Sequence, residues 1–116
     1  MKDELNGFVV FRPSVDKPAF LSTRQKSTGL SSGAWIKLDK PEYVNFFLDE
    51  DGKRVMLKVA EPNYDNALKV VFHGKGKNMC FGNKVLARKL TDMFGIGKQI
   101  PGHLVGTGIM IFEGER

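Results

Sequence analysis

The sequence contains one cysteine and lacks any long apolar run, and both features narrow what the protein can be. With Cys80 alone, no disulfide can form within the chain, and a zinc site built from several cysteines is excluded. No apolar stretch approaches the roughly 18 residues that a membrane-spanning helix requires. The opening segment MKDELNGFVVF carries two acids and only a short apolar run, so we do not expect a signal peptide. We therefore expect a cytoplasmic protein without membrane association.

Residues suited to catalysis or metal binding are also scarce. The two histidines, His73 and His103, lie far apart, and neither an HxH nor an HExxH motif occurs. The acids of DEDG (49–52) are consecutive, whereas an EF-hand loop needs oxygen ligands at alternate positions. No histidine or acid lies next to Cys80, so we expect a buried structural thiol. We expect a non-enzymatic protein with no cofactor and no metal site, and keep a small-molecule enzyme as the weakest alternative.

The segment HGKGKN, residues 73–78, looks most like a site, because two glycines alternate with two lysines after a histidine. It does not match the phosphate-binding P-loop, which needs GxxxxGK[ST] leading directly from a strand into a helix. No serine or threonine follows either lysine. We expect a hairpin turn whose glycines serve the backbone geometry and whose tip carries Lys75 and Lys77.

The length of 116 residues and a hydrophobic fraction of 41% favour one domain, residues 1–116, with a substantial core. Short segments rich in β-branched and aromatic residues predict about nine strands. These segments are GFVVF (7–11), AFLST (19–23), AWIKL (34–38), EYVNFFL (42–48), KRVMLKVA (53–60), ALKVVFH (67–73), MCF (79–81), HLVG (103–106) and GIMIFE (108–113). The polar segment RQKSTGLSSG (24–33) predicts a flexible loop, either functional or simply a solvated connection.

The clearest hairpin is predicted over residues 42–60. Apolar residues alternate with others on both sides of the turn DEDG, and an Asp-Gly turn between two alternating segments favours a β-hairpin. Most of the phenylalanines lie at apolar strand positions and are expected in the core, whereas Trp35 and Tyr43 are the better candidates for exposed aromatics.

The period changes from two to that of a helix over NKVLARKLTDMF, residues 83–94. Leu86, Leu90, Met93 and Phe94 share one helical face. Asn83 can cap the helix start by accepting a backbone N–H. Gly95 suits the left-handed position after the end, with Ile96 making the apolar contact that closes it. The fold class is therefore α+β, mainly β: a compact barrel of about nine short strands with one amphipathic helix.

Positive charge is concentrated in one part of the chain. The net charge is +5. The segment from Lys69 to Lys98 contains seven basic residues and a single acid, Asp92. Phosphate binding needs cations at suitable spacing and no particular motif, so this distribution predicts nucleic-acid contact. The alternative is a solvated basic face with no partner. The predicted nucleic-acid-binding residues are Lys75, Lys77, Lys84, Arg88, Lys89, Arg24 and Lys26.

The second half of the chain resembles a half-barrel of the AbrB/MazE swapped-hairpin family. The resemblance is carried by MCF, the helix NKVLARKLTDMF, Gly95-Ile96 and the strands HLV and IMIF, with an echo in WIKLDK and PEYVNFFLDEDGKRVMLKV. Most members of that family bind DNA, so the resemblance implies a DNA-binding, regulator-like protein. In the echo, Pro41 stands where a helix would begin.

The segments PEYVNFFLDEDGKRVMLKVAEP and KVLARKLTDMFGI are also similar to small uncharacterised bacterial and prophage proteins. That similarity implies a fold more than an activity. The alternative function is therefore a phage or prophage protein-interaction module, or an inhibitor of a host complex. Many short strands leave edges to cover, so a homodimer built by strand pairing is compatible with both functions.

Overall fold

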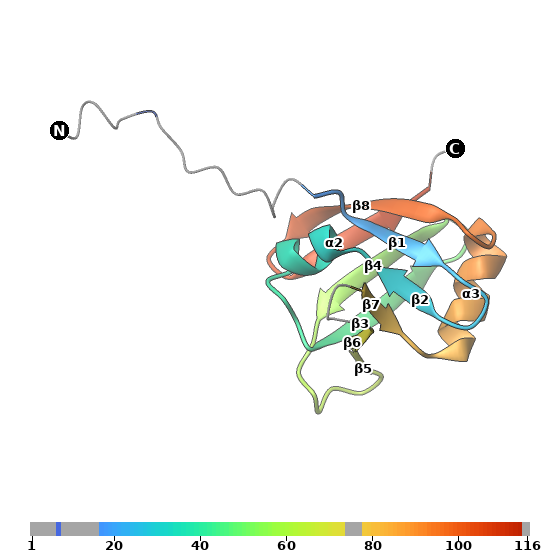
Figure 1. Cartoon of the computed structure of the whole chain (residues 1–116), viewed down its shortest axis with the longest axis horizontal. Helices are drawn as coiled ribbons and strands as arrows, with labels where there is room; N and C mark the ends of the chain where they lie inside the picture. The colour runs from blue at the N-terminus through green and yellow to red at the C-terminus, as the bar shows by residue number, and fades with distance from the viewer. Residues whose placement is uncertain (1–6, 8–16, 74–77, 115–116) are drawn as a thin grey trace.

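The computed structural model describes residue 7, residues 17–73 and residues 78–114 of the chain. In this part, nine strands form one antiparallel sheet in the order β5-β3-β4-β9-β8-β1-β2-β7-β6, which curls into a nearly closed barrel with two helices packed on it (Figure 1). This confirms the predicted mainly β, α+β class. The elements are β1 (Phe20–Thr23), β2 (Thr28–Leu30), α2 (Ser32–Lys37), β3 (Tyr43–Asp49), β4 (Arg54–Val59), β5 (Leu68–Lys69), β6 (Val71–His73), β7 (Asn78–Phe81), α3 (Lys84–Phe94), β8 (Gln99–Gly106) and β9 (Ile109–Glu113).

The two edge strands of the sheet are consecutive in the chain. The segment predicted as one strand over 67–73 is divided into β5 and β6 at Val70, which is buried and donates its N–H to the carbonyl of Glu42 at 2.8 Å. The chain therefore passes from one edge of the sheet to the other within a single residue. At this corner the two edges of the sheet are linked by the continuous chain and not by hydrogen bonds between β5 and β6.

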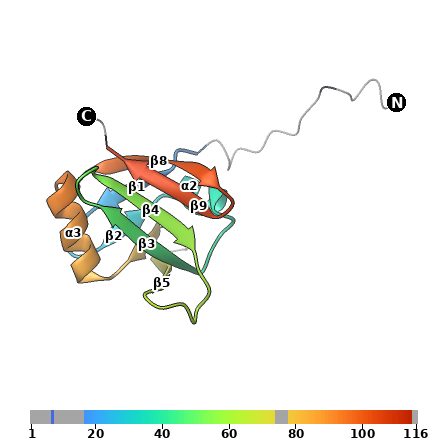
Figure 2. The ribbon, with the colours of Figure 1, turned by 180° about the vertical axis from the view of Figure 1, so that it is seen from behind.

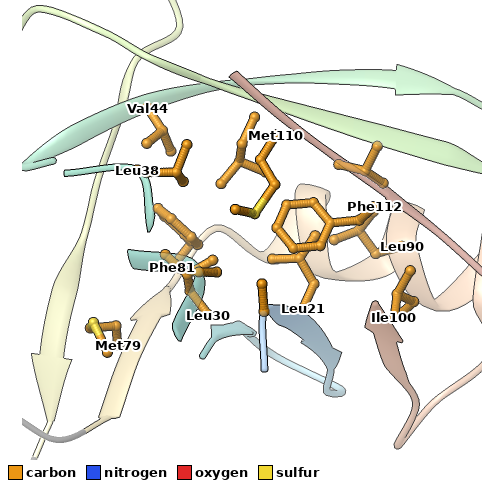
Figure 3. Packing of buried hydrophobic residues seen from close by; sticks show 14 of the residues in the cluster. Leu21, Leu30, Leu38, Val44, Met79, Phe81, Leu90, Ile100, Met110 and Phe112 are labelled. Atoms are coloured by element: carbon orange, nitrogen blue, oxygen red, sulfur yellow. The ribbon is translucent and has the colours of Figure 1, made fainter. Parts of the chain in front are cut away.

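The core fills the space between two halves of the barrel, β1-β2-β7 in front in Figure 1 and β3-β4-β9 in front in Figure 2. Both halves contribute alternate side chains, as the period of a strand requires. Leu90 of α3 reaches the same cluster as Leu21 and Phe112 (Figure 3). Gly102 lies opposite Phe112, and a Cβ there would come 2.4 Å from the phenylalanine ring, so the packing of this ring needs a glycine.

The predicted hairpin and helix are confirmed. Strands β3 and β4 pair across the turn with Leu48 opposite Val55. Helix α3 begins after Asn83, whose side chain accepts the N–H of Leu86 at 3.0 Å, as expected for an N-cap. Gly95 ends it with a positive φ of 92°. Ile96 is 61% exposed, so the apolar contact predicted to close the helix is wrong.

The strand predicted over 34–38 is wrong, because these residues lie mostly in helix α2. The hydroxyl of Ser31 accepts the N–H of Ala34 at 3.1 Å and caps the helix. Ala34 and Leu38 are both buried, and their spacing of four residues is that of a helical face. Trp35 is half-buried through an edge-on contact with Phe72, and Tyr43 is also half-buried, so neither is the exposed aromatic that was predicted.

The flexible loop predicted over 24–33 is also wrong in its second half. Strand β2 occupies residues 28–30, is buried throughout, and pairs with β1 on one side and β7 on the other. Three residues are too few to show a period of two, so only the tertiary context reveals this strand. Strand β8 likewise begins at Gln99, four residues earlier than predicted.

The remaining predictions are met in part. β1, β7 and β9 occupy the predicted segments, and His73 pairs with Asn78 on either side of the predicted HGKGKN turn. Apart from its first residue, the strand predicted over 7–11 lies outside the described residues. The predicted order of strand, helix and two strands is found as β7-α3-β8-β9, whereas the predicted echo in the first half has helix α2 in place of the leading strand. The family resemblance itself stays a prediction.

Thr23 joins strand β1 to the segment that follows α3. Its backbone N–H donates to the carbonyl of Lys98 at 2.9 Å, and its carbonyl accepts the N–H of Gly97 at 2.8 Å. Its hydroxyl donates to the carbonyl of Gly95 at 2.6 Å and accepts the N–H of Lys98 at 2.8 Å. Thr28 lies directly opposite on β2 and is equally buried, but its hydroxyl has no hydrogen-bond partner among the described residues.

Thr23 and Thr28 give a matched test of the joint, by which we mean the hydrogen bonds that link Thr23 to the segment after α3. We expect Thr23→Val to lower the free energy of unfolding by about 1–3 kcal/mol, because it removes two hydrogen bonds to partly buried backbone groups, each of which contributes about 0.5–1.5 kcal/mol. Thr28→Val removes a hydroxyl that bonds nothing in the described structure, so it should be neutral or stabilising. Urea denaturation of both variants checks this, and equal losses of stability would contradict the proposed role of the Thr23 hydroxyl.

Candidate nucleic-acid interface

Helix α3 lies across one end of the barrel. It connects β7 to β8, and the strand order places β1 and β2 between them, so the connection must pass three strand spacings, about 14 Å. A helix of 11 residues is about 16 Å long. The helix therefore just covers the distance, and Figure 1 shows it beside the turn that joins β1 to β2.

The exposed side of α3 carries its charges. Leu86, Ala87, Leu90 and Met93 face the core, as the helical period predicted. Lys84 and Arg88, one turn apart, are exposed, and neither forms an ion pair with a described acid. Val85 lies beside them with 70% of its surface exposed. Around these three residues the surface of the helix is therefore open to solvent.

Lys89 faces a different neighbour from the other two bases of the helix. Its Nζ lies 3.3 Å from a carboxylate oxygen of Glu50, in the turn between β3 and β4. The pair is exposed on both sides and contributes little to stability. It does reduce the positive charge that Lys89 offers to a partner, so the structure places this predicted residue at the margin of the interface.

The turn between β1 and β2 brings two further bases to the same end of the barrel. Arg24 and Lys26 are exposed in this turn, which begins at Thr23, beside the end of α3. The turn ends at Thr28, which pairs with Phe81, two residues before the cap of α3. Because both ends of the turn are held at the ends of the helix, the fold brings residues from positions 24–26 and 84–88 together.

We call this surface the basic end and define it by five exposed basic residues. Within the described part of the chain none of them forms an ion pair, and Asp92 is the acid that α3 exposes beside them. The residues are Arg24, Lys26, Lys84, Arg88 and Lys98. Lys98 was not among the predicted site residues, because only the hydrogen bonds to Thr23 show that the segment after α3 returns to the β1-β2 turn.

The predicted contacts Lys75 and Lys77 lie outside the described residues. Strand β7 separates their turn from α3, and its four residues span about 10 Å. The whole length of β7 therefore lies between these lysines and the start of α3, as the strand predicted over 79–81 implies. Their part in the interface stays a prediction.

The turn between β3 and β4 carries the opposite charge. The Asp49 carboxylate accepts the N–H of Gly52 at 3.0 Å and two N–H groups of Arg54, at 3.0 and 2.8 Å. The hydrogen bond from Gly52 and then that from Arg54 lower the pKa of Asp49, and the carboxylate in turn raises the pKa of Arg54. A mixed-charge hollow of about 970 Å³ between this turn and the end of α3 is lined by Asp51, Lys53, Lys98 and Glu113, among others.

The described residues offer no group of three or more His, Cys, Asp or Glu side chains that could hold a metal ion. His103 is exposed on β8, and three strands separate β8 from β6, which carries His73. Cys80 is buried in β7, as predicted. Neither described helix has the length and apolar character needed to cross a bilayer.

Comparison with known protein families, with curated proteins and with solved structures gives no match for this chain. The function is therefore inferred from the surface described above.

The hydrogen bonds of Asp49 predict a pH dependence of stability. Because its pKa is lowered in the folded state, its stabilising contribution is complete above the ordinary value of 3.8 and is lost as the pH falls through the lowered pKa. We expect Asp49→Asn to be less stable than the wild type at neutral pH and to lose less stability between about pH 5 and pH 2. Thermal unfolding across this range measures the difference. Asp51→Asn removes a carboxylate of the same turn but leaves these hydrogen bonds in place, so it should keep the wild-type profile.

Proposed function

We propose that the protein binds nucleic acid through the basic end, contacting phosphates. The observation that carries the proposal is that the fold gathers basic residues from two distant parts of the sequence at one end of the barrel. None of these five side chains has an ion-pair partner in the described part of the chain. Such side chains can neutralise phosphates without first breaking an internal ion pair, and counter-ions released from the nucleic acid then favour binding.

The surface favours contact with the backbone over base stacking. Exposed large aromatic residues in the described structure are Phe47, Tyr64 and Phe72, and none belongs to the basic end. Single-stranded nucleic acid is usually bound by aromatic side chains on which bases stack. A duplex offers phosphates without requiring such contacts. Together with the AbrB/MazE resemblance, this makes duplex DNA the favoured substrate, bound by a regulator-like, non-enzymatic protein.

Binding should depend steeply on salt. With five contacts of this kind, the logarithm of the association constant should fall against the logarithm of salt concentration with a slope of up to about −4.5 for a duplex. Fluorescence anisotropy with a labelled duplex and the matching single strand, starting at about 50 mM salt, measures this slope. An absence of salt-sensitive binding to either probe would overturn the proposal.

Removing two contacts on α3 gives a sharper test. We expect Lys84→Gln with Arg88→Gln to weaken binding to all sequences alike and to reduce the salt slope by about 2, because each phosphate contact contributes about 1. Lys58→Gln with Lys69→Gln is the matched control. It removes the same charge from exposed positions on β4 and β5, on the other half of the barrel. If both double variants lose affinity equally, net charge and not the basic end determines binding.

A second candidate function is protein contact through β8. Strand β1 pairs with β8 over Gln99–Pro101, and the N–H of Gly102 donates to the carbonyl of Ala19. Beyond that point β8 continues to Gly106 with β9 on one side and no described strand on the other. Leu104 and Val105 are about half exposed there. Antiparallel pairing with β8 of a second copy would satisfy the backbone groups of both chains that pair with no described strand.

Sedimentation velocity tests this candidate. We expect a concentration-dependent dimer for the wild type, and a monomer of unchanged thermal stability for Val105→Lys, because a lysine on an edge strand opposes pairing. Lys58→Gln, on β4, is a control substitution that leaves β8 intact. A wild-type protein that stays monomeric at the highest soluble concentration would contradict self-pairing, and this result leaves the nucleic-acid proposal unaffected.

A further inference from the structure

The side chain of Arg24 is folded back onto the sheet. Ser22 and Gly29 are opposite each other in the β1-β2 pair, and a Cβ on Gly29 would lie 2.8 Å from Nη2 of Arg24 and 3.1 Å from its Cζ. The guanidinium therefore occupies space that any side chain at position 29 would fill. In this position Arg24 makes no hydrogen bond or ion pair with another described residue.

A shallow groove of about 450 Å³ opens next to this guanidinium. Its volume lies within the range of small-ligand sites, about 300–1,000 Å³, and exceeds what a single phosphate group requires. Among the described residues that line it, two are cationic and none is acidic. The lining residues are Lys17, Pro18, Phe20, Ser22, Arg24, Leu30, Ser31, Ser32, Met79 and Gln99.

Of the polar side chains in the groove, one is used in hydrogen bonds within the protein, and the others form none with described residues. The hydroxyl of Ser31 donates to the carbonyl of Pro18 and accepts the N–H groups of Phe20 and Ala34, so it holds the structure together and offers nothing to a ligand. The side chains of Ser22, Ser32 and Gln99 make no hydrogen bond with another described residue. All three can donate, and with Arg24 and Lys17 they make a set of donors with no carboxylate among the described lining residues.

We propose that this groove is a phosphate site in which Arg24 donates two parallel N–H···O hydrogen bonds to one phosphate group. Lys17 adds a second positive charge, and Ser22, Ser32 and Gln99 donate to the remaining oxygens. A planar guanidinium matches the geometry of a phosphate in this way, and charge-assisted bonds of this kind are among the strongest in proteins. Gly29 acts as a positioning residue, because its missing side chain lets the guanidinium rest on the sheet.

The inference rests on the proposed function in one respect, namely that the phosphate would belong to a bound nucleic acid. Arg24 belongs both to the basic end and to the groove, and Gln99 directly follows Lys98. A backbone that crosses α3 at Lys84 and Arg88 can therefore continue over Arg24 into the groove. A free phosphate group has the same chemistry, so the experiment must distinguish the two sources.

The test uses a substitution that leaves the net charge unchanged. Gly29→Ala displaces the guanidinium, while its other close neighbour, the Cβ of Ser22 at 3.2 Å, needs to move by only a few tenths of an ångström. Gly82→Ala is the matched control, since a Cβ there meets nothing within 4 Å. The probes are inorganic phosphate and an unphosphorylated thymidine dinucleotide, which has a single phosphodiester. The readout at constant ionic strength is the Nε–Hε NMR signal of Arg24 and, for the variant that lacks this group, the backbone amide signals of Ser22, Ser32 and Gln99 in the groove.

In the wild type and in Gly82→Ala, we expect the Arg24 signal to shift and saturate with a phosphate probe. In Gly29→Ala and in Arg24→Lys, which keeps the charge but loses the planar group, affinity should fall at least about tenfold. Saturation by the dinucleotide supports a backbone phosphate, and saturation by inorganic phosphate alone supports a free phosphate as the ligand. Either result supports the site, whereas no saturation in the wild type, or equal affinity in Gly29→Ala, overturns it.

The two proposals can fail separately. Phosphate binding at the groove by a wild-type protein that binds no duplex would leave the groove and remove the proposed function. Salt-sensitive duplex binding by a wild-type protein whose Arg24 signal saturates with neither phosphate probe would leave the proposed function and remove the groove. Thermal unfolding of Gly29→Ala, expected to match that of Gly82→Ala, shows that any loss of affinity is local.

Discussion

The hydroxyl of Thr23 holds the end of α3 against strand β1, and the end of the barrel depends on this joint. It donates to Gly95 and accepts from Lys98, two backbone groups that follow the helix. The backbone of Thr23 bonds to the same segment. Because backbone groups shielded from water need hydrogen-bond partners, a side chain that satisfies two partly buried groups at once fixes where the helix ends and where β8 begins.

The same joint brings the proposed interface together. The turn after Thr23 carries Arg24 and Lys26, and the helix that the joint holds carries Lys84 and Arg88. The opposite charge gathers elsewhere, in the β3-β4 turn, where Asp49 is bonded to Arg54. The barrel thus separates a basic end from an acidic turn, and Lys89, bonded to Glu50, marks the border between them.

Local patterns in the sequence predicted what local physics determines. The alternation around DEDG and the four-residue spacing within 83–94 are both satisfied by neighbours in the chain, and both elements were predicted correctly. The strand at 28–30 was missed because its three residues form a strand only between β1 and β7. Helix α2 was predicted as a strand because its short apolar run AWIKL is typical of one, whereas the signal for a helix is the cap at Ser31.

The predicted interface residues divide in the same way. The bases of α3 were found from helical spacing, whereas Lys98 and the groove beside Arg24 depend on strand register, which pairs Ser22 with Gly29 and with Gln99. No pattern within one segment indicates such a pairing. The sequence therefore predicted the bases of the helix and of the β1-β2 turn, and the structure added Lys98 and the groove.

The most direct test of the account is to map the surface that a duplex covers. Backbone amide NMR signals would be followed during titration with a DNA duplex of mixed sequence. The account predicts that the largest shifts occur in the β1-β2 turn, along the exposed side of α3 and at Lys98, and that β4 and β5 are unaffected. Shifts centred on the β3-β4 turn or on the far end of β8, with the basic end unchanged, would contradict it.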